Sequence, residues 1–476
     1  MLFLVLRNVK KHDQKGTCEV NGNSTRHVVV EPGGALVVAH VGLHALGRFA
    51  DRIGLPEAIS PLFPQTGERA ARHDRGTVLT QAMLMLAGGG NSCADIEQLR
   101  IQDRLFGDVC SDTTLYRTVR QVTAPRLVDL VTAVASVRAG VWRRMSATTG
   151  TATVVLDIDA SLVEVHSENK QGTGPTYKGG FGFHPLLCFA DCTGEALAAL
   201  LRPGNAGANT VVDHLSVLDT AVAQLPSEIA AGHHAGDDPG VGNRAVQVRA
   251  DSAGCTDGFV HGCRQRNIGF AVVARSNASI HAAISRIDTK DEARWCPAIR
   301  AVGDPAQRSQ VTEITDLVDL TAWPAGTRLI VRRERLHEGA QRSLFPSQRY
   351  RYWGHYTDAA GTPAVLDKHM RAHAHVEENI KRLKDSGLER FPFTDLDANR
   401  AWLQLVCTAD SLVRWFQQLC CTGPLAKAAP KRLRWELWHT PARIIRQARH
   451  DIIRIIDDWP STNDLINAYR HIATLN

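Results

Sequence analysis

The sequence predicts an α/β protein in which a mixed sheet is flanked by helices, with an N-terminal helical domain and a β-rich insertion. Residues 36–150 carry apolar side chains at helical spacing, whereas residues 151–275 begin with strand-like runs and then alternate strands with helices. Residues 276–362 contain few long helices and several strand candidates. Strands that come first and then alternate with helices are typical of a mixed sheet covered by helices.

Composition sets the broad class of protein. The 476 residues are 44% hydrophobic and 22% charged, as in an ordinary globular protein, and the net charge of +6 is compatible with a polyanionic partner. No apolar run approaches the roughly 20 residues of a membrane span, and the opening MLFLVLRNVKK is too short for a signal peptide. The 11 cysteines include no C-x-x-C pair and are expected to be buried thiols. We therefore expect a cytoplasmic protein without a membrane partner.

The N-terminal third divides into a leader and a helical domain. Residues 1–35 lack periodicity and are expected to form a loose leader. Within residues 36–150, Ser111 and Asp112 offer capping oxygens to a helix that carries Tyr116 and Arg117. This arrangement is compatible with a helix-turn-helix that contacts DNA, and equally with a packed helical domain.

The run of residues 154–167, at the start of the catalytic core proposed for residues 151–275, is the most informative strand. A side-chain period of two places Asp157, Asp159 and Ser161 on one face. Two neighbouring carboxylates on an apolar strand repel each other unless cations or hydrogen bonds compensate. They indicate either a solvated edge strand or a set of oxygen ligands for Mg²⁺ or Mn²⁺.

Two later carboxylates complete a candidate site. Asp251 follows the strand at residues 246–250, at the end where α/β sheets commonly bind ligands. Glu377 lies on a helix over residues 369–388, in one stripe with His373, Lys381 and Lys384 and next to the apolar face, whereas Glu378 points away from that face. The alternatives are a surface helix with Glu–Lys pairs and, less favoured, a zinc site at the helical histidines.

The remaining segments complete the domain organisation. Residues 363–422 are expected to return to the catalytic core as helices, and residues 423–476 to form a basic helical segment. The excess of Lys and Arg from Lys427 to Arg454, interleaved with Trp435 and Trp438, favours phosphate binding over a merely solvated helix face.

The three carboxylates in this order match the metal-binding residues of RNase H-like polynucleotidyl transferases. In the words LDIDASLVEVHSE, YKGGFGFHPLLCF, LLRPGNAGANT, VRADSAG, IVRRERLHEGAQRSLF and HVEENIKRLKDSGL, the sequence resembles bacterial insertion-sequence transposases of the DDE type, specifically the insertion-sequence family thirteen-eighty. The resemblance extends over about residues 40 to 460 and excludes the leader.

This resemblance implies an RNase H-like fold and a catalytic triad of Asp159, Asp251 and Glu377. The family's word of Asp, a small residue and then Thr or Ser begins here at Asp159, while Asp157 remains the alternative first carboxylate. Lys384 stands where the related signature has a lysine after the glutamate.

The implied DNA contacts depart from the wider signature. Its Tyr and Arg before the glutamate are replaced by Met370 and His373, for which Arg371 and His375 are the candidate substitutes. Arg332 and Arg333 are further candidates, with a charged strand edge as the alternative. The residues expected to bind DNA are Lys384, Lys381, His373, Arg371, Arg332 and Arg333.

The resemblance further implies an enzyme that depends on Mg²⁺, for which Mn²⁺ can substitute, and that holds two ions. Such an enzyme cleaves double-stranded DNA at the terminal inverted repeats of an element and joins the ends to target DNA, as a homodimer that pairs two ends. A nuclease of the same fold and an inactive DNA-binding copy are the alternatives.

Overall fold

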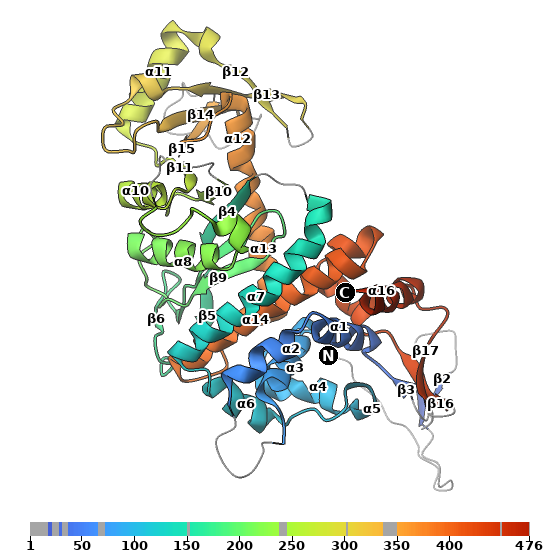
Figure 1. The fold of residues 1–476 in the computed structure, drawn as a ribbon. Coiled ribbons are helices and arrows are strands. Elements are labelled where there is room, and N and C mark those ends of the chain that lie inside the picture. The colour runs from blue at the N-terminus through green and yellow to red at the C-terminus, as the bar shows by residue number, and fades with distance from the viewer. Residues whose placement is uncertain are drawn as a thin grey trace.

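A nine-stranded mixed sheet organises the protein (Figure 1). The computed structural model describes residues 18–20, 28–30, 37–64, 72–149, 153–237, 245–300, 303–336, 350–447 and 450–475. The strand order is β12-β13-β14-β15-β11-β10-β4-β8-β9. The core comprises β4 (Val154–Ala160), β8 (Leu186–Ala190), β9 (Ala196–Leu200), α8 (Val211–Ala223), α9 (Ser227–Ala230), β10 (Val246–Ala250), α10 (Asp257–Gln265) and β11 (Gly269–Val273).

The centre of this sheet is parallel. β10 pairs in parallel with both β4 and β11. On the other side of β4, β8 pairs antiparallel with β4, and β9 pairs antiparallel with β8. Leu156 and Ile158 are fully or nearly fully buried, and because side chains alternate along a strand, Asp157 and Asp159 share the opposite face. The strand expected over residues 154–167 is in fact two: β5 (Val163–Val165) belongs to a small sheet with β6 (Gly174–Pro175) and β7 (Phe181–Phe183).

The β-rich region extends the core sheet. It contains α11 (Ala278–Lys290), η3 (Glu292–Arg294), β12 (Cys296–Ile299), β13 (Pro305–Glu313), η4 (Thr315–Leu317), β14 (Arg328–Arg335) and β15 (Tyr350–Thr357). β15 pairs antiparallel with β11, Ala271 lying opposite Thr357, and β14, β13 and β12 follow outward. The strands of this region are therefore continuous with the core sheet through backbone hydrogen bonds.

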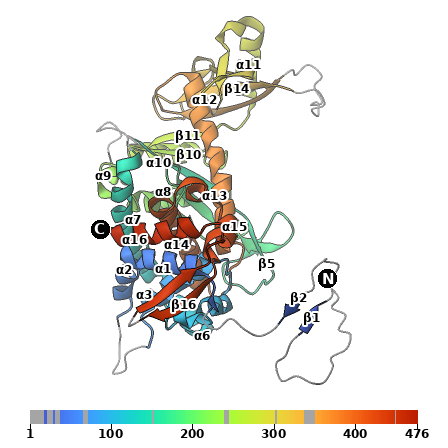
Figure 2. The same ribbon diagram turned by 90° about the vertical axis from the view of Figure 1, so that its right-hand side faces the viewer.

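A helical column connects this region to the core. It consists of α12 (Pro363–Arg371), a 3₁₀ turn η5 (Ala372–Ala374), α13 (His375–Leu383) and a π-type turn η6 (Lys384–Leu388). Figure 2 shows α12 and α13 as a nearly straight column. The column ends where Gly387 has a φ of 110°, a left-handed conformation that glycine adopts without steric cost. Since α13 packs on β4, its residues lie over the carboxylate-bearing face of that strand.

The N-terminal helices pack around a helix from the far end of the chain. They are α1 (Val41–Arg52), α2 (Leu55–Ile59), η1 (Ser60–Leu62), α3 (Arg75–Ala87), η2 (Cys93–Ile96), α4 (Glu97–Arg100), α5 (Asp103–Phe106), α6 (Asp112–Arg120) and α7 (Ala124–Thr149). α14 (Leu396–Cys420) contacts α1, α3, α6 and α7, and also β9 (Figure 1). It buries Trp402 and Trp415 completely, so the two ends of the chain share one hydrophobic core.

The proposed helix-turn-helix surface is partly occupied within the chain. The ring of Tyr116 on α6 stacks on Phe393 with centroids 5.1 Å apart, and Arg120 pairs with Asp395 at 2.8 Å. These contacts favour the packed-domain alternative for this face of α6, whereas Arg117 is exposed.

The prediction of a wholly helical C-terminal segment is wrong. After η7 (Gly423–Lys427), α15 (Pro430–Leu433) and η8 (Arg434–Trp438), the chain forms a hairpin of β16 (Ala442–Gln447) and β17 (His450–Ile455) before α16 (Thr462–Thr474). Closely spaced isoleucines favour strand over helix here, and β16 pairs with β3 (Val37–Val38) near the other end of the chain. Within the leader, β1 (Cys18–Val20) pairs with β2 (Val28–Val30); the rest of residues 1–35 lies outside the described residues.

Candidate active site

Asp159 and Asp251 occupy equivalent positions on neighbouring parallel strands. In the register of β4 and β10, Leu156 lies beside Val248 and Ile158 beside Ala250. The next residue of β4 is Asp159, and Asp251 is the first residue after β10. Continued by one residue, the register places the two carboxylates side by side at the carboxyl ends of the pair, where strands lie about 4.8 Å apart. Both side chains are half-buried. Sequence reasoning predicted these two residues individually, and the strand register brings them together.

Glu377 approaches the pair from α13. It lies in the first turn of that helix, is exposed, and its charge acts on the carboxylate of Asp159. Glu378 is also exposed but lies within 3.8 Å of Lys381 and lines a separate cavity beside α14. Of these two adjacent glutamates, the carboxylate of Glu377 is the one whose charge acts on Asp159.

The carboxyl group of Asp159 is poorly stabilised as an anion. Burial raises its pKa, the charges of Asp251 and Glu377 raise it further, and the result is a pKa of about 6. The backbone amide of Ala160, which donates to Oδ1 at 2.7 Å, and the nearby His373 offset only part of this effect. A divalent cation between these carboxylates would remove the repulsion.

Asp157, the alternative first carboxylate, is committed to a buried ion pair. Its side chain has no exposed surface, and Arg249 binds it in a bidentate manner, with Nε 2.8 Å from Oδ1 and Nη2 2.6 Å from Oδ2. Although burial raises the pKa of a carboxyl group, hydrogen bonds from His373 and Arg249 outweigh that effect and lower the pKa of Asp157. Both carboxylate oxygens of Asp157 therefore already accept hydrogen bonds, and these bonds hold β4 to β10 and to the helical column.

His373 connects the helical column to this ion pair. Its Nδ1 lies 2.7 Å from Oδ1 of Asp157, and because that carboxylate only accepts, the imidazole donates. Arg249 also donates to the carbonyl of His369 at 2.8 Å and lies 2.9 Å from Asp191. The ion pair thus fixes α12 and α13 over β4. His373 is buried and hydrogen-bonded to Asp157, which favours a supporting role over the predicted contact with DNA.

The other cations predicted to bind DNA differ in their availability. Lys381 on α13 is exposed and lies 3.8 Å from Glu378, and Lys384, the first residue of η6, is half-buried. Arg332 and Arg333 are buried: Arg332 pairs with Asp367 at 2.9 Å, and Arg333 pairs with Asp288 and Glu292 and lies between two aromatic rings. Arg371 also pairs with Asp367. All three guanidinium groups are occupied by carboxylates, distant in sequence for Arg332 and Arg333 and four residues away for Arg371, so the expectation of free DNA-binding cations does not fit their surroundings.

The oxygen donors of the triad suit a hard divalent ion. Within the described ranges, no three Asp, Glu, His or Cys side chains already stand at metal-coordinating positions. The electrostatic strain on Asp159, caused by two further carboxylates, nevertheless matches a site completed by a cation.

Arg249 and Asp191 are the residues of this region that sequence reasoning missed. The signal for Arg249 was its position in VRADSAG, where it is the charged residue of a short, valine-rich strand and stands two positions before Asp251. A buried arginine requires a carboxylate partner, and Asp157 is the nearest buried one.

A family model identifies the class of protein. Residues 20–476 match the family described as Transposase DDE domain group 1, and the chain belongs to that family. It is a DNA transposase, an enzyme that cleaves DNA and transfers the cut strand. The match is wider than the stretch over which the sequence words resemble such enzymes.

Other comparisons give less. A solved structure of the piggyBac transposase, in a synaptic complex with hairpin DNA, is similar over 84% of this chain and 80% of that chain, with a TM-score of 0.39 and 10% identity. A search of curated proteins found no significant match. Among the described residues, no helix is both long and apolar enough to span a bilayer.

Proposed function

We propose that this transposase uses Asp159, Asp251 and Glu377 to bind two Mg²⁺ ions at the edge of an RNase H-like core. The feature that carries this assignment is the register of β4 and β10, which makes Asp159 and Asp251 neighbours, together with the charge of Glu377 on Asp159. Support for the RNase H-like core comes from the strand order β11-β10-β4-β8-β9, in which β11, β10 and β4 are parallel, β8 runs opposite to β4, and β9 runs opposite to β8.

The residues divide the chemistry among them. When bound, the two ions supply an activated water or 3′-hydroxyl and stabilise the leaving oxygen of an in-line displacement. Asp159 and Asp251 hold the site on the rigid sheet, while Glu377 closes it from α13. Asp157, Arg249 and His373 keep that helix over the strand. Lys381 and Lys384 place positive charge beside the scissile phosphate.

The substrate proposed is double-stranded DNA with the terminal inverted repeats of a bacterial insertion sequence of family thirteen-eighty, together with target DNA. A homodimer is proposed because transposition must bring two element ends together. Mn²⁺ is expected to substitute for Mg²⁺, since both prefer oxygen ligands. The setting proposed is the bacterial nucleoid, where such DNA lies.

The decisive experiment compares adjacent glutamates. A labelled duplex containing an element end is incubated with Mg²⁺ and wild type, Glu377→Gln or Glu378→Gln. Glu377→Gln is expected to bind the duplex but lose cleavage, because it removes one ligand charge, whereas Glu378→Gln is expected to cleave within about threefold of wild type.

Other outcomes point to other functions. Equal activity of Glu377→Gln and wild type would refute the triad. Cleavage by wild type without joining to a target duplex would identify a nuclease, and binding without cleavage in either metal would identify an inactive copy.

A further inference from the structure

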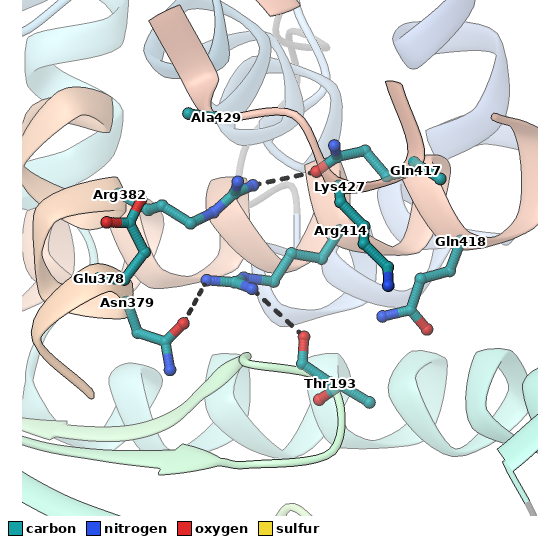
Figure 3. A pocket seen from close by; sticks show the side chains of 10 residues that line it. Thr193, Glu378, Asn379, Arg382, Arg414, Gln417, Gln418, Lys427 and Ala429 are labelled. Atoms are coloured by element: carbon teal, nitrogen blue, oxygen red, sulfur yellow. Dashed lines mark hydrogen bonds between the residues drawn. The ribbon is translucent and has the colours of Figure 1, made fainter. Parts of the chain in front are cut away.

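An open cavity of about 260 Å³ lies beside the catalytic helix, on a different flank from Glu377. α13, α14, η7 and the turn between β8 and β9 enclose it (Figure 3). Arg382 reaches in from α13, Arg414 and Gln418 come from α14, and Lys427 comes from η7. Its lining is therefore polar and contains three cationic side chains.

The two arginines share a single buried carboxylate. Asp410 is 1% exposed; Nε of Arg414 lies 2.6 Å from its Oδ2, and Nε of Arg382 lies 3.4 Å from its Oδ1 without forming a hydrogen bond. The remaining contacts of both guanidinium groups are to neutral oxygens. Arg382 donates to Gln417 and the carbonyl of Ala428. Arg414 donates to Asn379 and to the carbonyl of Thr193.

Positive charge is therefore in excess in this cavity. Arg382 is 6% exposed, burial lowers its pKa, Asp410 offsets part of that effect, and the neighbouring Arg414 lowers the pKa further. Lys427 is exposed and has no ion-pair partner in the part of the chain that the structure describes. Glu378, the carboxylate in the lining itself, is exposed; its charge raises the pKa of Arg382, and it also lies 3.8 Å from Lys381. Buried cations that lack a matching carboxylate are stabilised by an external anion.

The geometry suits a phosphate rather than a carboxylate of another side chain. A guanidinium has five N–H donors, and Arg382 and Arg414 each use only part of this set on the protein. Gln418 and Lys427 also line the cavity and are both exposed, so their amide and ammonium groups add flexible donors.

The cavity also lies close to the reaction centre. Arg382 follows Glu377 by five residues on one helix, or about 7.5 Å along its axis. At about 100° per residue, Lys381 lies between Glu377 and Arg382 around that helix, and it is exposed. A strand passing over Glu377 thus meets cationic side chains in the direction of the cavity.

We propose that this cavity binds a backbone phosphate of the DNA strand that lies in the active site, with Arg382, Arg414 and Lys427 as its ligands. This inference rests on the proposed function, and it adds an anchoring site that the catalytic carboxylates do not provide. The anchor holds the strand in register with Glu377 without reading its sequence, because phosphate contacts position DNA and carry no base information.

The test uses these exposed residues of the lining, so that the buried network stays intact. Binding of a labelled element-end duplex is measured by fluorescence anisotropy from 50 to about 300 mM NaCl for wild type, Lys427→Ala and Gln418→Glu. Loss of one phosphate contact is expected to lower the slope of log affinity against log salt by about one for Lys427→Ala. Gln418→Glu is expected to weaken binding at least about tenfold, because it places a carboxylate beside the phosphate.

Lys431→Ala is the matched control. Lys431 is an exposed lysine of the same basic segment, pairs with Asp385 at 3.1 Å and lies outside the cavity lining. Its loss is expected to change affinity less than twofold. Equal effects of Lys427→Ala and Lys431→Ala would overturn the proposal, since general surface charge would then explain both.

Two further outcomes separate the possible failures. If wild type binds no duplex at all, the proposed function fails together with the anchor. If wild type binds but Lys427→Ala and Gln418→Glu bind equally well, only the anchor fails. Competition by millimolar inorganic phosphate that is lost in Lys427→Ala would support the proposal, because free phosphate would then displace a backbone phosphate of DNA from this cavity.

Discussion

Asp157 and Asp159 lie two residues apart on one strand and share one face, but their surroundings are opposite. Asp157 is fully buried, accepts three hydrogen bonds from Arg249 and His373, and has a lowered pKa. Asp159 is half-buried among carboxylates, and its pKa is raised to about 6. The same side chain is therefore stabilised as an anion at one position and destabilised at the other. The difference distinguishes a carboxylate that is paired within the fold from one that lacks a cationic partner and fits the proposed metal site.

The largest expected effect concerns Asp159. Asp159→Asn should lower the rate of DNA cleavage about a thousandfold, because loss of a ligand charge weakens a metal that supplies several kcal/mol to the transition state. Its thermal unfolding in the absence of metal should occur at the same or a higher temperature, since repulsion from Asp251 and Glu377 is relieved. A Tm well below that of wild type would place Asp159 with Asp157 as a structural residue.

Asp157→Asn should show the reverse pattern. It leaves Arg249 buried with a weakened partner, and breaking one side of a buried ion pair costs about 3–5 kcal/mol. Urea unfolding followed by circular dichroism measures this loss. Replacing both partners together, as Asp157→Asn with Arg249→Met, should recover part of the stability. Unchanged stability of Asp157→Asn would remove the distinction between the two aspartates.

A smaller effect is expected at His373. His373→Ala removes a charge-assisted hydrogen bond to Asp157 and should cost about 1.5–3 kcal/mol, whereas His373→Asn retains a donor and should cost less. Unfolding free energies and the Mg²⁺ concentration needed for half-maximal cleavage are the two measurements. If His373 positions α13, the metal requirement should rise for Ala and be rescued by Asn; equal values for both would indicate a packing role alone.

The smallest expected effect is a pH dependence of stability that comes from His355. This histidine is buried, and no carboxylate pairs with it in the part of the chain that the structure describes. Burial, with a contribution from His369, lowers its pKa to about 3, so the folded chain keeps His355 neutral while the unfolded chain protonates it below about pH 6.5. Stability should therefore fall as pH drops from 6.5, by roughly 1 kcal/mol over the first unit.

His355→Gln is the matching variant, because glutamine does not titrate. Urea unfolding of both proteins at pH 7.5, 6.5 and 5.5 should show their difference in stability narrowing toward low pH. Parallel curves would show that His355 does not contribute to the pH dependence.

The strands and helices of the core were predictable because their patterns are local. Val246–Ala250 has the predicted bounds, since a short run of β-formers between turn residues leaves few alternatives. The pairing of β15 with β11, by contrast, joins segments more than 80 residues apart, and no local pattern reports it. The C-terminal hairpin was not predicted, because the excess of Lys and Arg around its isoleucines indicates a basic helix face as readily as a strand.

The candidate site was predictable in composition but not in arrangement. A period of two places Asp157 and Asp159 on the same face, so the strand pattern could not separate them. The partner that does so, Arg249, lies 92 residues further along the chain. For the same reason Arg332 and Arg333 resembled free DNA-binding cations: Asp367 and Asp288, which occupy them, come from other elements.

The bond between His373 and Asp157 spans 216 residues of chain, and α14, which contains the tryptophans of the shared core, follows still later. During synthesis the first two carboxylates leave the ribosome long before the glutamate does. A growing or prematurely terminated polypeptide therefore lacks both Glu377 and the helix that Asp157 secures. Gene copies with a stop codon or frameshift in the first three quarters of the reading frame consequently yield products that lack Glu377, the glutamate of the proposed site, and α14, the helix that completes the shared hydrophobic core.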